Sequence, residues 1–268
     1  MGSKSAFLFS LRAFIDEIGE LAPLAKDHTS SCERLSNRLD ELCRFMLAED
    51  NERLWRQWGS HADIAACCAE LRGTAVHALS ELEKAQAART YDRKVNISAY
   101  TSILSDSAKE ELRSVKIGRT SKVLFIGAGA FPLSAMTIAK ETDAEVLCAD
   151  IDAEAVLLGS RVIEAAGLHT KIHYSETPFR ETAFLKEATH CIVASLVPHK
   201  SEVLAEWKPF LNSSSRVVLR YGNGLKSIFN YPLEGSFSND WLLTPFTRSK
   251  SMYDILMLVS KESVMTGA

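Results

Sequence analysis

The sequence lacks most of the features that mark membrane, fibrous or disordered proteins. It contains no apolar run of the roughly 18 residues that a membrane-spanning helix needs. With 7 prolines and 13 glycines among 268 residues, it is neither collagen-like nor dominated by linkers. It also has no excess of basic residues, since the formal net charge is −3. We therefore expect no nucleic-acid partner and no membrane partner.

The six cysteines form neither a metal-binding nor a disulfide pattern. None belongs to a Cys-x-x-Cys pair, and Cys67 and Cys68 are adjacent on a helical pattern. Cys148 and Cys191 lie in apolar, strand-like runs. This usage favours buried, reduced thiols in a cytoplasmic protein with no bound metal.

What the chain does contain is a composition typical of globular proteins, with 46% hydrophobic and 24% charged residues. Apolar residues recur at helical spacing through the first ninety residues. They predict one helix that ends before Pro23 and counts Phe9 among its apolar positions, then a second capped by Thr29 or Ser30. Further helices are predicted over 51–58 and 62–88.

The pattern changes after the polar connector 116–121. Continuous apolar runs predict buried strands at 123–126, 145–149, 171–174, 189–195 and 216–221, and helices are expected at 133–142 and 153–166. A hairpin-like pair is expected at 241–247 and 252–259. The fold class is therefore α/β: an all-helical domain over 1–115 precedes a doubly wound, Rossmann-like domain over 116–268.

The most informative motif is the turn 127–132 with the acids that follow the next strand. Gly127 and Gly129 let the backbone turn sharply at the strand end, and Asp150 is spaced to accept hydrogen bonds from a ribose. Pro132 stands where a dinucleotide site has its third glycine, so no pyrophosphate cradle is expected. S-adenosylmethionine fits these requirements. A tight turn beside a solvated Asp-Ile-Asp is the alternative.

A second motif follows the strand at 216–221. Arg220 and Tyr221 end that strand, where α/β sheets bind ligands, and Asn223 lies in a polar turn between two glycines. A surface hairpin is an equal alternative on spacing alone.

These motifs resemble those of the nicotianamine synthase family. The resemblance is carried by the turn 127–133, by 150–152, by 219–226 and by 229–232, and it covers the chain from about residue 30 to its end. It is strongest to the bacterial branch that makes opine metallophores of the staphylopine and pseudopaline type. The resemblance implies a helical bundle lying over a Rossmann-like S-adenosylmethionine-dependent transferase domain.

The resemblance also implies a reaction. The 3-amino-3-carboxypropyl (aminobutanoyl) group of S-adenosylmethionine would pass to the amine of histidine, and 5′-methylthioadenosine would leave. S-adenosylmethionine is thus a co-substrate, no metal is required, and a downstream opine dehydrogenase-type reductase is implied as a partner. The histidine enantiomer and the oligomeric state stay open, a homodimer included.

This chemistry needs a general base, because an ammonium group has no lone pair. The resemblance places that role on Glu83, with Glu81 as the other register, and gives Tyr100 a part in steering the amine. The two glutamates point about 200° apart on a helix, so they cannot both face one pocket.

The remaining site residues follow from the same motifs and resemblance. Those expected to bind S-adenosylmethionine are Gly127, Ala128, Gly129, Phe131, Pro132, Asp150, Ile151, Asp152, Thr177, Ser195 and Leu196. Those expected to bind the acceptor are His77, Arg220, Tyr221 and Asn223. His199 and Lys200 could bind a carboxylate or could form a helix-start surface, and Phe179 could stack on adenine or belong to the core.

Two other functions are compatible with the sequence. A small-molecule methyltransferase would use the same ribose site but release S-adenosylhomocysteine. A non-catalytic protein with a degenerate site is the other, although Gly127, Gly129 and Asp150 are all retained.

Overall fold

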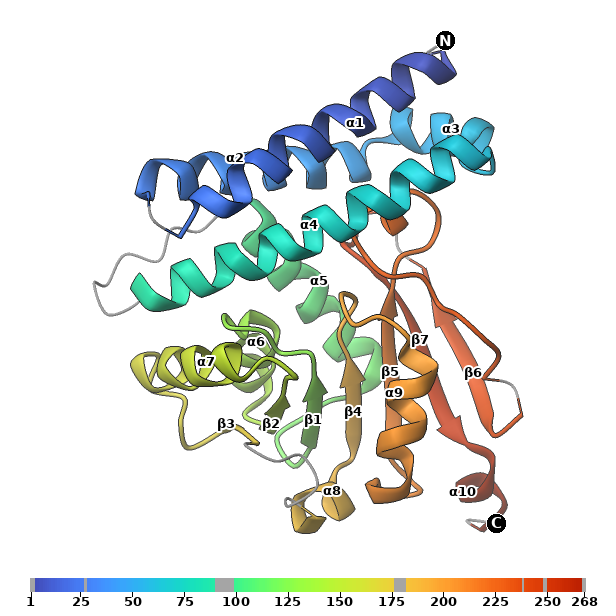
Figure 1. The fold of residues 1–268 in the computed structure, drawn as a ribbon. Helices are drawn as coiled ribbons and strands as arrows, with labels where there is room; N and C mark the ends of the chain where they lie inside the picture. Colours follow the sequence, from blue (N-terminus) through green and yellow to red (C-terminus); the bar gives the residue numbers. More distant parts are fainter. Residues whose placement is uncertain are drawn as a thin grey trace.

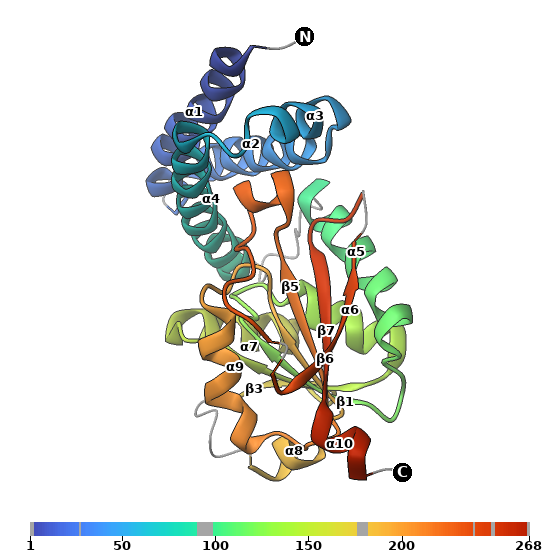
Figure 2. The ribbon, with the colours of Figure 1, turned by 90° about the vertical axis from the view of Figure 1, so that its right-hand side faces the viewer.

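The computed structural model describes residues 3–26, 28–89, 99–175, 182–237, 239–247 and 250–266. The described N-terminal part is helical, as predicted. Its elements are α1 (Lys4–Leu21), the 3₁₀ turn η1 (Ala22–Leu24), α2 (Thr29–Leu47), α3 (Glu49–Trp58), α4 (Ala62–Arg89) and α5 (Ala99–Val115). Helices α1 to α4 form a layer over one end of the sheet (Figures 1 and 2).

Two details of the predicted helices are wrong. Helix α1 buries Phe7, Leu11 and Phe14, whereas Phe9 is 74% exposed. A residue two positions away points about 200° around the helix, so Phe7 and Phe9 cannot share a face. Helix α2 begins at Thr29 after an N-cap at His28 that makes no side-chain hydrogen bond, so neither Thr29 nor Ser30 is the cap.

The described residues after 116 form one seven-stranded sheet with the order β3-β2-β1-β4-β5-β7-β6. The strands are β1 (Lys122–Ile126), β2 (Glu145–Ala149), β3 (Ile172–Tyr174), β4 (His190–Val193), β5 (Arg216–Tyr221), β6 (Trp241–Phe246) and β7 (Asp254–Ser260). Strands β1 to β5 are parallel, and β7 pairs antiparallel with both β5 and β6. The predicted α/β class, with helices preceding a Rossmann-like sheet, is confirmed.

Helices cover both faces of the sheet. They are α5 and α6 (Leu133–Thr142), α7 (Ala153–Ala165), α8 (Thr182–Glu187) and α9 (Lys200–Trp207), which the 3₁₀ turn η4 (Lys208–Phe210) follows. The 3₁₀ turn η5 (Gly224–Ile228) packs against α2, α3 and α4, and α10 (Lys261–Thr266) lies at the end of β7 (Figure 1). The strands alternate their side chains between two apolar cores: one contains residues of α5, α6 and α7, and the other contains residues of α8 and α9. Helix α5 precedes the predicted domain boundary at 115 but packs along α6, which follows it. The domain division at 115 stays a prediction.

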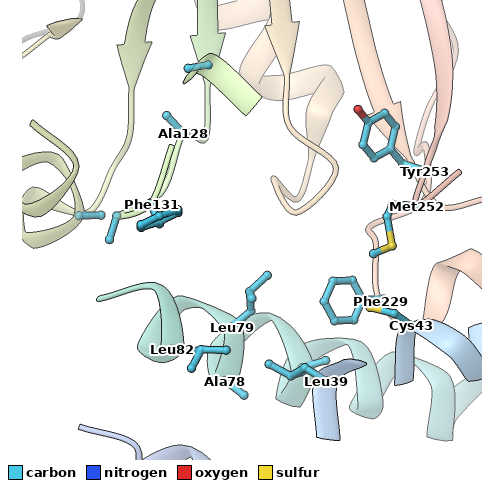
Figure 3. Close-up of a cluster of buried hydrophobic side chains, with 14 of the residues drawn as sticks. Leu39, Cys43, Ala78, Leu79, Leu82, Ala128, Phe131, Phe229, Met252 and Tyr253 are labelled. Atoms are coloured by element: carbon cyan, nitrogen blue, oxygen red, sulfur yellow. The ribbon is translucent and has the colours of Figure 1, made fainter. Parts of the chain in front are cut away.

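An apolar interface joins the helical layer to the sheet. Leu79 and Leu82 of α4 and Leu39 of α2 belong to the same buried cluster as Phe131, in the turn after β1, and Phe229 (Figure 3). This cluster is continuous with the core on one face of the sheet, so the helices above the strand ends share a core with the α/β part.

The cysteines and the apolar character of the helices can be compared with what the sequence predicted. All six cysteines are free and buried, as expected. Within the described ranges, no helix is both long and apolar enough to span a membrane.

Candidate active site

A cavity of about 700 Å³ lies where the carboxyl ends of the central strands meet helix α4. It includes the topological switch point of the sheet, where β1 lies between β2 and β4. Ligands of α/β sheets usually bind at this point. Its lining includes Val76, Leu79, Ser80, Glu83, Gly127, Ala128, Gly129, Phe131, Ser134, Asp150, Ile151, Asp152, Ser195, Leu196, His199, Arg220 and Tyr231.

The turn after β1 is held by hydrogen bonds to the neighbouring strands. The Gly129 N–H donates to Oδ2 of Asp150 at 2.8 Å, and the Tyr174 hydroxyl donates to the Gly129 carbonyl at 2.5 Å. Gly129 has φ +71°, a left-handed conformation that favours glycine. Pro132 is the N-cap of α6 and is not in the cavity lining, so its predicted ligand contact is not seen.

The two acids after β2 have different surroundings. Asp150 lines the cavity, and its Oδ1 accepts a hydrogen bond from the Asp152 N–H at 3.0 Å. Asp152 caps α7 through the N–H groups of Glu154 and Ala155 and forms an ion pair with Lys84 at 2.6 Å. Both acids line the cavity and both accept backbone hydrogen bonds, but only Asp152 is also paired with a lysine, so the geometry favours Asp150 for ribose.

Glu83 is the acidic side chain that α4 directs into the cavity. A Cβ added at Gly129 would lie 2.5 Å from Glu83 Oε2, so the carboxylate sits directly against this turn. Burial, together with the nearby Asp150 charge, raises the pKa of Glu83 to about 8, although a hydrogen bond from the Phe131 N–H acts in the opposite direction. Such a carboxyl can take and release protons near neutral pH.

The other predicted residues of α4 face away from the cavity. Val76, Leu79, Ser80 and Glu83 line it at helical spacing. Glu81 lies 3.8 Å from Lys84 and is not in the lining. His77 is exposed and outside the cavity lining, about 100° around the helix from Val76, and its substrate contact stays a prediction.

The loop after β4 contributes Ser195 and Leu196 to the cavity lining, and their binding of S-adenosylmethionine stays a prediction. Lys200 is 1% exposed, and its ammonium donates to the carbonyls of Ser195 at 3.2 Å and Val197 at 2.6 Å. Burial lowers the pKa of Lys200 to about 7. Lys200 thus supports the loop from behind and is not in the lining, whereas His199 lines the cavity and lies 3.1 Å from Glu234.

Of the residues predicted at the end of β5, only Arg220 lines the cavity. Its guanidinium pairs with Glu111 at 2.7 Å and donates to the Ser134 hydroxyl at 2.8 Å. Tyr221 points to the opposite sheet face, as successive strand residues must, and Asn223 is an exposed cap of η5. Neither is in the cavity lining, and their contacts with substrate stay predictions.

Some predicted site residues lie outside the described part of the chain. The side chain of Tyr100 does so, although its backbone is in α5, and so do Thr177 and Phe179. For the described residues, no group of three or more His, Cys, Asp or Glu side chains could hold a metal ion. Independence from metal stays a prediction.

Sequence reasoning gave no role to several lining residues. One of them is Ser134, at the start of α6. Another is Tyr231, which could have been predicted because it lies within the segment 229–232 that carries the family resemblance. Nothing local marks Tyr174, which reaches Gly129 from β3.

The chain is similar to curated enzymes along nearly its whole length. No protein-family model matches it. A protein of Pseudomonas aeruginosa named L-histidine 2-aminobutanoyltransferase is 35% identical over 261 residues, which cover 96% of this chain and 98% of that protein. A protein of Yersinia pestis with the same name is 30% identical over 264 residues, 95% of this chain and 96% of that protein.

Solved structures share the fold at lower identity. MtNAS, a nicotianamine synthase, in complex with MTA and tNA has a TM-score of 0.69 at 17% identity, covering 91% of this chain and 97% of that one. A mutant of MtNAS in complex with S-adenosylmethionine has a TM-score of 0.67 at 17% identity, covering 92% and 98%.

Proposed function

The chain belongs to the L-histidine 2-aminobutanoyltransferase family, and from this membership we propose that it transfers the 3-amino-3-carboxypropyl group of S-adenosylmethionine to the amine of L-histidine. The other product is 5′-methylthioadenosine. The choice of the L enantiomer follows the name that the relatives carry. Metallophore biosynthesis is the setting that the family resemblance implies.

The observation that carries this proposal is the Glu83 carboxylate beside Gly129 and Asp150. An amine nucleophile must lose its ammonium proton before it attacks the carbon bonded to sulfur, and Glu83 is placed to accept that proton. Glu83 lines the same cavity as the ribose candidate Asp150, so one cavity can hold both substrates.

Each group has a defined task in the proposed reaction. Asp150 accepts hydrogen bonds from the ribose hydroxyls, and the turn 127–129 lets the ligand approach the backbone. Glu83 takes the proton of the ammonium, which frees the nitrogen lone pair. That nitrogen forms a bond to the carbon of the 3-amino-3-carboxypropyl group that is attached to sulfur. The bond between this carbon and sulfur breaks, and its electron pair stays on sulfur. The cavity contributes orientation by holding the amine in line with the breaking bond.

The test is product analysis by mass spectrometry. Purified protein with S-adenosylmethionine and each histidine enantiomer should yield 5′-methylthioadenosine and a histidine adduct, with L-histidine as the better acceptor. Formation of S-adenosylhomocysteine instead would establish the methyltransferase alternative. Failure to bind S-adenosylmethionine in calorimetry would support the non-catalytic one.

Three further properties belong to this proposal. The protein works in the cytoplasm, which is supported by six free, buried cysteines. A separate reductase joins the product to an α-keto acid, as the resemblance implies. No metal takes part, so activity should survive exhaustive chelation; loss of activity that one divalent ion restores would contradict this.

A further inference from the structure

Lys84 joins helix α4 to the start of helix α7. Its Nζ lies 2.6 Å from Asp152 Oδ2 and 3.1 Å from Glu154 Oε2, and Glu81 Oε1 is 3.8 Å away. The side chains of Lys84 and Asp152 are 17% and 37% exposed, so water screens this pair less than it would at an open surface, whereas Glu154 is 52% exposed. The hydrogen bond from Lys84 lowers the pKa of Asp152, which keeps the pair ionised.

The ion pair continues into the ribose side of the cavity. The Asp152 N–H donates to Oδ1 of Asp150, and Oδ2 of Asp150 accepts from the Gly129 N–H. Gly129 is in turn the residue that the Glu83 carboxylate lies against. Two consecutive residues of α4, Glu83 and Lys84, therefore contact the two ends of one hydrogen-bonded chain.

This arrangement limits how α4 can rotate about its axis. Glu83 and Lys84 point about 100° apart, so fixing Lys84 on α7 fixes the direction of Glu83 as well. Leu79 and Leu82 hold α4 only through apolar packing, which is not directional. The ion pair adds a directional contact at this end of α4, beside the hydrogen bond from the Phe131 N–H to Glu83; farther along the helix, Arg72 donates to the Ser227 carbonyl at 2.6 Å.

Resting on the function proposed above, we propose that Lys84 is a positioning residue: its ion pair with Asp152 and Glu154 locks α4 onto the start of α7 and thereby holds Glu83 beside Gly129. Lys84 has no part in the chemistry itself. The contact couples the helix that carries the base to the loop that carries the ribose-binding acid.

The test compares Lys84→Met with Lys84→Arg and with a control ion pair. Lys109 and Glu141 lie 3.5 Å apart on the helices α5 and α6, so Lys109→Met removes an interhelical ion pair that does not involve α4. In Lys84→Met, release of methylthioadenosine at saturating substrate should slow at least tenfold, while the affinity for S-adenosylmethionine changes less than threefold. Lys84→Arg should recover this turnover to within threefold of wild type, and Lys109→Met should leave it unchanged.

Hydrogen exchange provides a readout that does not depend on activity. In Lys84→Met, amides over 80–89 and 150–155 should exchange at least tenfold faster than in wild type, and in Lys109→Met they should not. Wild-type turnover together with wild-type exchange in Lys84→Met would overturn the proposal. An inactive wild-type protein would instead contradict the proposed function, and the exchange result would still decide the role of Lys84.

Discussion

At the scale of single residues, Glu83 differs from Glu81 in what surrounds its carboxylate. Glu83 faces the cavity against Gly129, and burial with the Asp150 charge raises its pKa to about 8. Glu81 is only partly buried and faces Lys84. The same side chain two positions apart on one helix therefore has the properties of a base in one case and of a surface group in the other.

We expect Glu83→Gln to lower turnover by roughly 10²–10⁴-fold, the range for losing a general base. Glutamine keeps the shape of the side chain but cannot accept the ammonium proton. The measurement is the initial rate of methylthioadenosine formation, with affinity for S-adenosylmethionine measured separately and expected to change little. Raising the pH should recover part of the rate, since more of the free amine is then neutral.

Glu81→Gln is the matched control for this variant. It removes a carboxylate from the opposite side of the helix, so it should cost less than about threefold in rate. An inactive Glu81→Gln beside an active Glu83→Gln would contradict the assignment of the base.

The raised pKa of Glu83 also predicts how stability depends on pH. A carboxyl whose pKa is about 8 in the folded state, against about 4.3 when unfolded, binds its proton more tightly when folded. Its contribution to stability is complete below the unfolded pKa and is lost as the pH rises through 8. Asp150 and Tyr174 are charged or titratable groups that interact with Glu83, and both remain in the glutamine variant.

Glu83→Gln should therefore stabilise the ligand-free protein at high pH. We expect melting temperatures within about 1 °C of wild type at pH 5 and at least about 3 °C above it at pH 9. Thermal unfolding at both pH values checks this. An equal difference at the two pH values would show that the Glu83 pKa is not raised.

The sequence predicted the local parts of the site because they depend on local spacing. Gly129 and Asp150 follow consecutive strands, and parallel strands end at one edge of the sheet. The partner of Arg220 could not be predicted in this way. It is Glu111, which lies on α5, and no local sequence pattern relates α5 to β5. The sequence thus indicated a cavity residue at 220 but could not show that its charge is already paired.

At the scale of elements, the strands were easier to predict than the helix faces. A buried parallel strand is a continuous apolar run, so the predicted ranges 145–149 and 216–221 match β2 and β5. Helix α1 has apolar residues on more than one side, and only contact with α2 and α4 decides that Phe7 is inside and Phe9 outside. Tertiary packing therefore determines which side of α1 is buried.

The turn between β1 and α6 depends on having no side chain at Gly129. In Gly129→Ala, the new Cβ would crowd Glu83 Oε2 at 2.5 Å and would also strain a backbone with φ +71°. Strain of this kind costs about 1–2 kcal/mol, and displacement of the carboxylate should lower turnover at least tenfold. Denaturant unfolding and initial rates measure the two effects.

Gly167→Ala separates strain from displacement. Gly167 has φ +68° but nothing within 4 Å of an added Cβ, so this variant should lose similar stability and keep wild-type turnover. Equal losses of turnover in the two variants would show that the carboxylate of Glu83 does not need its contact with Gly129.

At the scale of the whole molecule, the site requires both parts of the chain. The strand ends supply Gly129, Asp150 and Ser195, and α4 supplies Glu83 from the layer above them (Figure 2). A sheet without that layer would retain Gly129 and Asp150 and lose Glu83, the proposed base. This explains how a sheet that also suits methyl transfer can perform the transfer of a larger group to an amine.

A buried ion pair ties α5 to the sheet beneath this cavity. Glu111 is 1% exposed and Arg220 is 2% exposed, with 2.7 Å between them. The Tyr253 hydroxyl donates to Glu111 Oε2 at 2.8 Å, and the Arg220 guanidinium lies 4.6 Å from the centre of the Tyr253 ring. Three segments far apart in the sequence therefore meet in one charged cluster.

Removing one partner should cost far more than removing both. Glu111→Gln leaves a buried guanidinium without its counter-charge, and such changes cost about 3–5 kcal/mol, whereas a buried pair replaced by apolar residues is often neutral. We expect the double variant Glu111→Leu/Arg220→Met to be more stable than Glu111→Gln in urea unfolding at pH 7. Losses in Glu111→Leu and Arg220→Met that simply add in the double variant would mean that the two residues stabilise the fold independently.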